Sequence, residues 1–161
     1  MAPRVKIERI GSFKVAYVRA KSVNPEGIAE AWTRLISWLG SKRALAKTSV
    51  GGGIGVIQGR PGDRGYKYEA AWPVDGEVET ARGVKIGETP EGTYAVLRHK
   101  GDLRKIEESI RVVTDEWIPN SGYEQAEGPI LTLHRNSLGV RHPDKQIVDV
   151  CVPVKKAGKK K

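Results

Sequence analysis

The segment Tyr66–Val74, with the sequence YKYEAAWPV, returns eighty residues later as Gln146–Val154, with the sequence QIVDVCVPV. In this register Glu69 aligns with Asp149, and both segments end in Pro-Val. Each copy carries an acidic residue within a strand pattern and a proline that is expected at a strand end or edge. The fold is therefore organised around two related closing strands.

The sequence upstream repeats at nearly the same spacing. Arg19 matches Arg98 near the end of a strand pattern, and Trp38 matches Trp117 near the end of a helix pattern. The spacing is half the length of the 161-residue chain. It is longer than the roughly 20–50 residues of solenoid repeats. We interpret it as a tandem duplication of two modules.

Each module has the predicted element order strand, helix, strand, strand. The modules span about residues 5–74 and about residues 84–154, with 75–83 as the linker between them. In the first helix pattern Asn24 is a capping signal and Gly40 a stop signal. In the second pattern, Asp102 is the predicted cap and Pro119 the predicted end. The predicted fold class is α+β, with an antiparallel sheet, two helices and a groove between the modules.

Composition and charge set further limits. A chain of 161 residues with 39% hydrophobic residues is typical of one globular domain. The net charge is +9, but five lysines lie within residues 155–161, which we interpret as a disordered basic tail that favours weak contacts with nucleic acid or other polyanions. No apolar run is long enough to span a bilayer, so no membrane association is expected. With Cys151 as the single cysteine, we expect a cytoplasmic protein.

Two patterns predict no cofactor or metal site. The run GGGIG at residues 51–55 has the composition of a phosphate loop, but a strand pattern follows it and no GK[ST] motif is present. We interpret this run as a flexible turn. The three histidines, His99, His134 and His142, lack the spacing of metal ligands.

The complete pattern resembles the GyrI-like small-molecule-binding domain, also called the AraC-type effector-binding domain. The resemblance covers nearly all of Val5–Val154, and we assign residues 1–154 to a single domain of this kind. It depends on the duplicated element order, the Trp-aliphatic helix ends, the acid-x-x-x-Pro-Val strands, and Gly128-Pro129 before a strand.

The resemblance implies a pocket between the modules, lined by aromatic residues and often holding a carboxylate. Members of the family bind lipophilic, often cationic, compounds. Some are sensor halves of transcription regulators, one protects DNA gyrase from toxins, and some stand-alone members look like hydrolases of cyclopropane-bearing genotoxins. Members that bind drugs often carry a glutamate and a tyrosine in the strand after Gly-Pro. Here that strand has Thr132 and His134 near those places.

Candidate site residues are aromatic, acidic or hydrogen-bonding groups expected near the groove. Glu69 and Asp149 are candidates to bind a ligand cation or act as a general acid-base group, with Tyr94 as a proton donor; solvated or ion-paired acids are the alternative. Trp32, on the helix stripe, is interpreted as a core residue. The full set of ligand-binding candidates is Tyr17, Trp38, Tyr68, Glu69, Trp72, Tyr94, Trp117, Thr132, His134 and Asp149.

Three functions remain open at this point. The first is a stand-alone, non-catalytic protein that binds or sequesters a lipophilic, cationic or toxic compound in the groove. The second is a hydrolase that uses Glu69 or Asp149 with Tyr94. The third is a modulator of gyrase or DNA assisted by the basic tail. We expect a monomer or a homodimer.

Overall fold

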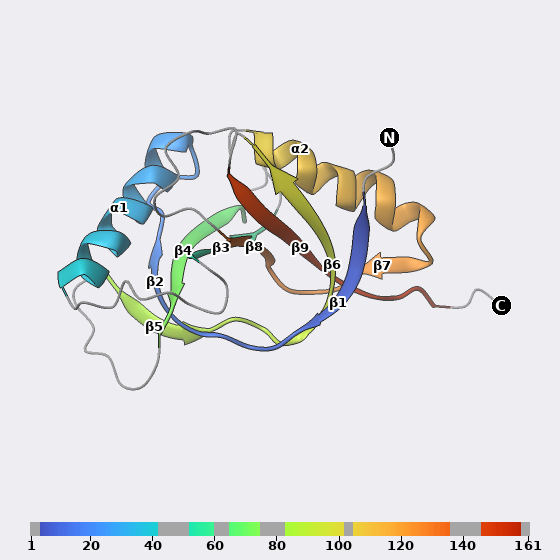
Figure 1. The fold of residues 1–161 in the computed structure, drawn as a ribbon, viewed down its shortest axis with the longest axis horizontal. Coiled ribbons are helices and arrows are strands. Elements are labelled where there is room, and N and C mark those ends of the chain that lie inside the picture. Colours follow the sequence, from blue (N-terminus) through green and yellow to red (C-terminus); the bar gives the residue numbers. More distant parts are fainter. Residues whose placement is uncertain are drawn as a thin grey trace.

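Strands form the framework of the molecule (Figure 1). A computed structural model describes residues 4–41, 52–59, 65–74, 83–101, 105–135 and 146–158. The strands within these residues are β1 (Val5–Ile10), β2 (Lys14–Arg19), β3 (Ile54–Gln58), β4 (Lys67–Pro73), β5 (Lys85–Glu88), β6 (Gly92–Lys100), β7 (Tyr123–Gln125), β8 (Ile130–His134) and β9 (Ile147–Lys156). The helices are α1 (Pro25–Ser41) and α2 (Ile106–Arg111); a π-helical segment (Val112–Trp117) and a 3₁₀ turn (Ile118–Asn120) continue α2.

The strand order reflects the two halves of the chain. It reads β1-β6-β9-β8-β3-β4-β2-β5, and every neighbouring pair is antiparallel. Exchanging each strand with its counterpart in the other half gives the same order read from the opposite edge of the sheet. The first strand of each half pairs with the second strand of the other half, because β1 pairs with β6 and β5 pairs with β2. The predicted α+β class is confirmed, and this order is the one expected of two related halves.

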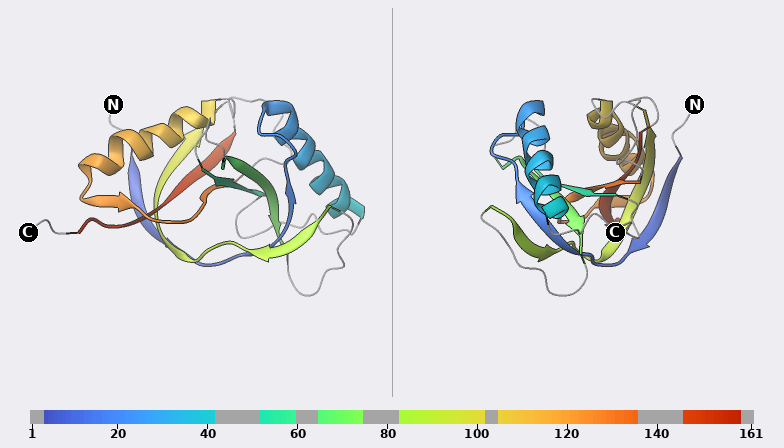
Figure 2. Two further views of the ribbon diagram at one scale, coloured as in Figure 1. Left: turned by 180° about the vertical axis from the view of Figure 1, so that it is seen from behind. Right: turned by 60° about the vertical axis from the view of Figure 1, so that its left-hand side comes forward.

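Both helices lie on the same side of the sheet, one over each half (Figure 2). α1 packs on β2 and β4, and α2 packs on β6 and β9. The side chain of Asn24 caps α1, because its Oδ1 accepts a hydrogen bond of 2.7 Å from the backbone N–H of Gly27. The stripe Ala31, Leu35 and Leu39 is completely buried against the sheet. The central strands β3 and β8 carry neither helix.

Strand alternation divides the interior into two apolar clusters. On the helix side, Tyr68, Ala70 and Trp72 of β4 join the helix stripes in one core. On the opposite side, Val56 and Ala71 belong to a second cluster to which no described helix contributes. The β-sheet is therefore buried on both faces near its centre, and the face on which a residue lies determines which cluster it joins.

The interpretation of residues 155–161 as a disordered tail is wrong for the first two residues. Lys155 and Lys156 continue β9, where they pair with Glu124 and Tyr123 of the unpredicted strand β7. The Lys155 Nζ also lies 3.5 Å from a carboxylate oxygen of Glu124. The backbone pairing of β7 with β9 explains why Lys155 and Lys156 are ordered. The amino-acid composition of the tail does not show this pairing. Residues 159–161 lie outside the described residues.

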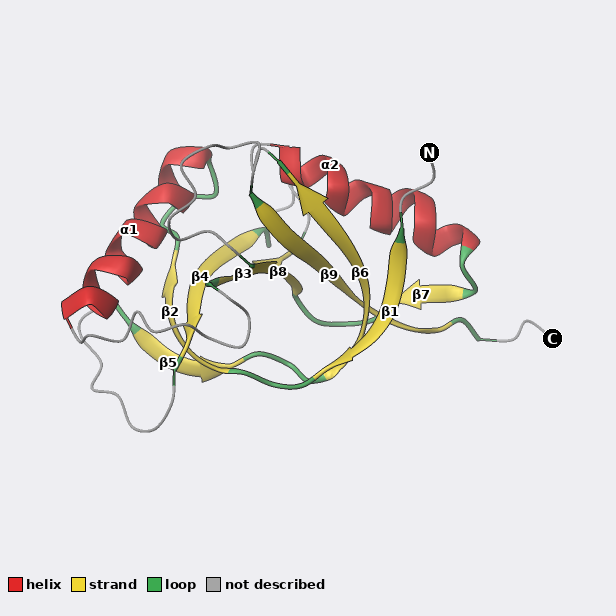
Figure 3. Ribbon diagram, in the orientation of Figure 1, coloured by secondary structure: helices red, strands yellow, loops and turns green. Residues whose placement is uncertain are grey.

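The second helix also differs from its prediction. Its predicted cap, Asp102, lies outside the described residues, and so do residues 75–82 of the predicted linker. The helical ribbon continues past α2 through the π-helical segment (Figure 3). Pro119 does not end it but lies in the first turn of the 3₁₀ segment, which extends to Asn120. A proline is tolerated there because the first helical N–H groups have no intrahelical partner.

None of the helices within the described residues has both the length and the apolar character that crossing a membrane requires.

Candidate functional site

A groove of about 390 Å³ lies between α1 and α2, over residues of β3, β4 and β8. This position, between the two halves, is the one expected from the sequence. Most of its lining is apolar or aromatic. The described residues that line it are Val23, Pro25, Ile28, Ala29, Trp32, Ile57, Tyr66, Tyr68, Ile106, Glu107, Ile110, Thr132 and His134.

The walls of the groove come from the two helices. Ile28 and Trp32 are four residues apart on α1, and Ile106 and Ile110 are four residues apart on α2. Residues at this spacing share one helix face. Each helix therefore presents a pair of large apolar side chains to the groove.

The floor of the groove comes from β3, β4 and β8. Tyr68 lies on β4, and its hydroxyl accepts a hydrogen bond of 2.9 Å from the indole Nε1 of Trp32. Thr132 and His134 alternate along β8 and therefore face the same side; the Thr132 Oγ1 lies 3.1 Å from the His134 Nε2. The rings of Trp32 and His134 meet edge to face, with centroids 5.3 Å apart. One wall tryptophan thus contacts both sides of the floor.

The floor is uncharged at neutral pH. His134 is 7% exposed, and its burial lowers the pKa of the imidazole to about 4. Burial also raises the pKa of the Tyr68 hydroxyl, which stays protonated. Among the described lining residues, the single carboxylate is that of Glu107 on α2, which is an exposed residue. The groove therefore combines apolar walls with a neutral, hydrogen-bonding floor.

Gly55 of β3 and Gly53, which directly precedes β3, allow this arrangement of the groove side chains. A Cβ on Gly55 would lie 2.3 Å from the Thr132 Oγ1 and 2.6 Å from the Tyr68 hydroxyl. A Cβ on Gly53 would lie 2.5 Å from the Trp32 ring. The interpretation of the GGGIG run as a flexible turn is therefore wrong at these two positions. They are packing positions, where groove side chains rest directly on the backbone.

Three of the ten ligand-binding candidates line the groove, namely Tyr68, Thr132 and His134. The acids do not, because Glu69 and Asp149 occupy odd-numbered positions of strands whose even-numbered positions face the helices. Tyr17 is on the far face as well, where it packs against the second apolar cluster. The expectation that Glu69 or Asp149 contributes a carboxylate to the groove is therefore wrong, because strand register places both acids on the far face.

The two acids form equivalent ion pairs on the far face. The Glu69 Oε2 accepts a hydrogen bond of 3.1 Å from Arg19, and the two oxygens of Asp149 accept bonds of 2.8 and 3.2 Å from Arg98. Each arginine is the directly opposed strand partner of its acid. The positions that align in the sequence repeat thus carry the same interaction in both halves.

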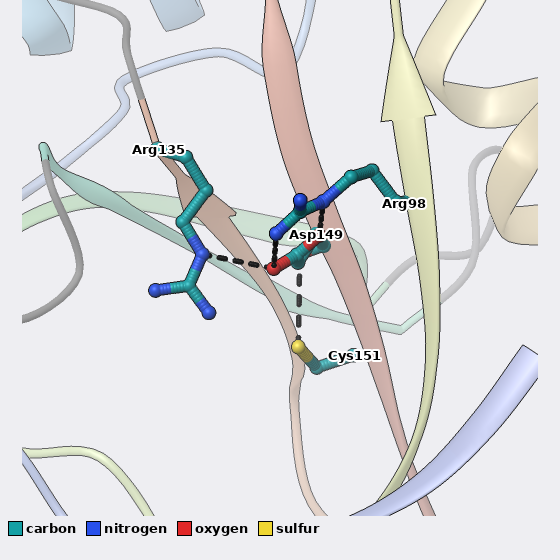
Figure 4. Close-up of polar contacts among 4 residues, drawn as sticks. All are labelled: Arg98, Arg135, Asp149 and Cys151. Atoms are coloured by element: carbon teal, nitrogen blue, oxygen red, sulfur yellow. Dashed lines mark hydrogen bonds and ion pairs between the residues drawn. The ribbon is translucent and has the colours of Figure 1, made fainter.

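Asp149 has an additional partner in the second half. The Nε of Arg135 donates to its Oδ2 at 2.8 Å, and Figure 4 shows the carboxylate between the two guanidinium groups. Burial opposes ionisation, but the hydrogen bonds from Arg98 and Arg135 hold the pKa of Asp149 below its ordinary value. The neighbouring Cys151 is completely buried, and burial raises the pKa of its thiol. A buried thiol of raised pKa is a poor nucleophile, in keeping with its expected role in the core.

The other candidates lie away from the groove. Tyr94 belongs to the second apolar cluster, and its hydroxyl donates to the carbonyl of Pro90 at 2.8 Å. Trp72 is 1% exposed and Trp38 is also buried in the core. Trp117 stacks on Tyr123 near β7. A role for these residues in ligand binding stays a prediction.

Sequence reasoning missed the helix walls of the groove. Trp32 was assigned to the core, although its ring reaches the groove. Ile28, Ile106 and Ile110 also line the groove, but helical spacing does not show which apolar residues of a helix extend beyond the sheet. The residues of the floor were easier to identify from the sequence, because Thr132 and His134 are two positions apart on one strand and therefore face the same side.

Within the described ranges, no three His, Cys, Asp or Glu side chains lie close enough to hold a metal ion.

Comparisons with known proteins agree with this architecture. The sequence pattern of a family described as the GyrI-like small molecule binding domain matches residues 3–155. A DNA gyrase inhibitor of Erwinia billingiae is 31% identical over 137 residues, which cover 80% of this chain and 82% of the relative. A probable transcriptional regulator, YgiV of Escherichia coli K12, is 31% identical over 91 residues, or 55% of this chain. The matched segment spans only about half (56%) of that regulator.

A solved structure gives the same result for the fold. The structure of SAV2435 bound to tetraphenylphosphonium superposes with a TM-score of 0.69 at 16% identity, and the match covers 94% of each chain.

Proposed function

The chain belongs to the family of GyrI-like small-molecule-binding domains, and from this premise we propose that it binds an apolar, ring-containing molecule in the groove between α1 and α2. The single observation that carries the proposal is the groove itself. It has about 390 Å³ of space, apolar pairs on both walls, and hydrogen-bonding groups of Tyr68, Thr132 and His134 on its floor. Sites for small molecules are typically concave and mostly apolar, with a few placed polar groups.

The indole ring of Trp32 on the groove wall favours a flat ligand. The indole of Trp32 is held by its hydrogen bond to Tyr68 and by its edge contact with His134. A ring fixed in this way loses little conformational entropy when a ligand stacks on it. Ile106 and Ile110 on the opposite wall supply the apolar surface that would contact the second face of the ligand.

Binding of 1-methylnaphthalene, followed by isothermal titration calorimetry, tests this proposal. We expect a Kd on the order of 0.1 mM for a probe with so few heavy atoms. Replacing Trp32 by alanine should weaken binding roughly tenfold, because the variant lacks the aromatic wall. No heat of binding with the folded wild-type protein would overturn the proposal.

The matched control is Trp117→Ala. Trp117 is a partly buried tryptophan that stacks on Tyr123 and does not line the groove. Its replacement should leave the Kd for 1-methylnaphthalene within about twofold, provided that circular dichroism shows a folded protein. Equal losses in both variants would show that general destabilisation, and not the groove wall, explains the effect of Trp32→Ala.

A further inference from the structure

The floor of the groove contains an unused hydrogen-bonding atom. The backbone N–H of His134 donates to the carbonyl of Gly53, and the Nε2 of the ring contacts Thr132. Within the part of the chain that the structure describes, the other ring nitrogen, Nδ1, has no hydrogen-bonding partner. The side chain is more than nine-tenths buried and lines the groove. Because the ring borders the groove, a ligand group can reach this nitrogen and add one hydrogen bond to its binding.

The chemistry of a neutral imidazole defines which ligand group can bond the Nδ1 of His134. One ring nitrogen carries a proton and donates a hydrogen bond, and the other accepts a hydrogen bond. If Thr132 donates to the carbonyl of Gly55, at 3.4 Å, the Nε2 of His134 carries the proton and Nδ1 accepts. In the other tautomer Nδ1 donates. A ligand hydroxyl satisfies both cases because it can donate and accept.

The same floor disfavours a cation. Tyr68, Thr132 and His134 are uncharged, so a cationic head group placed against them would lose its hydration without meeting a counter-charge. The desolvation of an ion costs several kcal/mol, whereas a desolvated contact with the face of an indole returns about 2 kcal/mol or slightly more. Glu107 is exposed, and an exposed ion pair contributes about 1 kcal/mol or less.

We propose that the groove selects an uncharged ring compound whose hydroxyl or similar group bonds His134, and that it discriminates against cations. This inference depends on the proposed function, since it specifies the ligand of the same groove. It separates this chain from SAV2435, whose structure contains the lipophilic cation tetraphenylphosphonium.

Two matched pairs of probes test the inference by calorimetry at pH 7. The first pair is 1-naphthalenemethanol and 1-methylnaphthalene, which differ by one hydroxyl. The alcohol should bind about three- to tenfold more tightly, the effect of one net hydrogen bond. The second pair is (1-naphthylmethyl)trimethylammonium and 1-neopentylnaphthalene, which share a shape and differ by one charge. The cation should bind at least roughly tenfold more weakly.

The outcomes separate the inference from the proposed function. Binding of none of the four probes overturns both. Binding of the methyl and neopentyl compounds with no advantage for the alcohol overturns the hydrogen-bond part alone. A cation that binds as tightly as its neopentyl counterpart overturns the charge part alone and leaves the groove as a binding site.

Variants identify the residues responsible. His134→Leu should abolish the advantage of the alcohol while 1-methylnaphthalene still binds; an advantage that persists in a folded His134→Leu protein contradicts the assignment. If this variant does not fold, the binding of 1-naphthalenemethanol and 1-methylnaphthalene to the wild-type protein still tests whether a ligand hydroxyl strengthens binding. Glu107→Gln should weaken the residual binding of the ammonium probe by about fivefold at most. Glu108→Gln changes an exposed neighbour that does not line the groove and should leave this binding unchanged. Equal effects of these two changes contradict a local role for Glu107.

Discussion

Gly55→Ala is expected to lower the free energy of unfolding by about 2 kcal/mol or more and to abolish the preference for a hydroxyl-bearing ligand. The added Cβ would lie 2.3 Å from the Thr132 Oγ1 and 2.6 Å from the Tyr68 hydroxyl, far inside normal contact distance. Both groups are attached to strands that flank β3, so relief requires strained rotamers or a shift of the sheet. Urea denaturation gives the change in stability, and calorimetry with 1-naphthalenemethanol gives the change in binding.

Gly11→Ala is the matched control for this prediction. Gly11 precedes β2, and a Cβ built there meets no atom within 4 Å. Its replacement should be neutral or slightly stabilising, because alanine restricts the unfolded chain more than glycine does. A Gly55→Ala protein as stable as the Gly11→Ala protein would show that the groove floor does not rest on the β3 backbone.

Asp149→Asn is expected to cost about 2 kcal/mol of unfolding free energy at pH 7. The carboxylate is 6% exposed and accepts three hydrogen bonds from Arg98 and Arg135. An amide removes the charge and places an N–H₂ group against one guanidinium. Both arginines are partly exposed, so solvent can compensate for some of the loss, and we expect less than for a fully buried pair.

The pH dependence gives this prediction a second readout. The pKa of Asp149 is lower in the folded state than in the unfolded chain, where it is about 3.9. The unfolded state therefore binds more protons as the pH falls, and the contribution of Asp149 is lost on acidification. The difference between wild type and Asp149→Asn should be complete above about pH 5 and should shrink as the pH falls below about 4. A difference that stays constant down to pH 3 would show that charge is not its cause. The lowered pKa of His134 acts equally in both proteins and cancels in the comparison.

Glu69→Gln serves as the control at the corresponding position of the other half. Glu69 has one arginine partner, Arg19, which is more than half exposed. We expect a cost below about 1 kcal/mol. A larger effect for Glu69→Gln than for Asp149→Asn would contradict the contribution assigned to Arg135.

The repeat in the sequence was sufficient to predict the class of fold and the general place of the site. Alternation and helical spacing predict α1 and the strands other than β7, and Asn24 caps that helix as expected. The alignment of Glu69 with Asp149, and of Arg19 with Arg98, corresponds to two real ion pairs. These features are local or follow from an internal comparison, so the sequence contains the information that determines them.

The face on which the acids lie was misjudged for a specific reason. A period of two shows that Tyr68 and Glu69 point to opposite faces, but it does not show which face meets the helices. Because the aromatic residues of β4 join the helix-side core, Glu69 must face away from the groove. The same uncertainty explains why a catalytic role for Glu69 or Asp149 was considered within the groove.

By itself, the sequence determined that two related units of strands and one helix each share one sheet, because the periodicity of apolar residues specifies each element and the repeat specifies their relation. The structure divides the first strand of each predicted unit into two, β1 and β2 in one half and β5 and β6 in the other. Only the tertiary structure decided that Trp32 lines the groove, that Gly53 and Gly55 support its floor, and that Lys155 and Lys156 belong to a strand. These three results depend on contacts between residues far apart in the chain. Whether a side chain covers a strand, borders a groove or meets solvent is set by the neighbour that packs against it, and no local pattern encodes that neighbour.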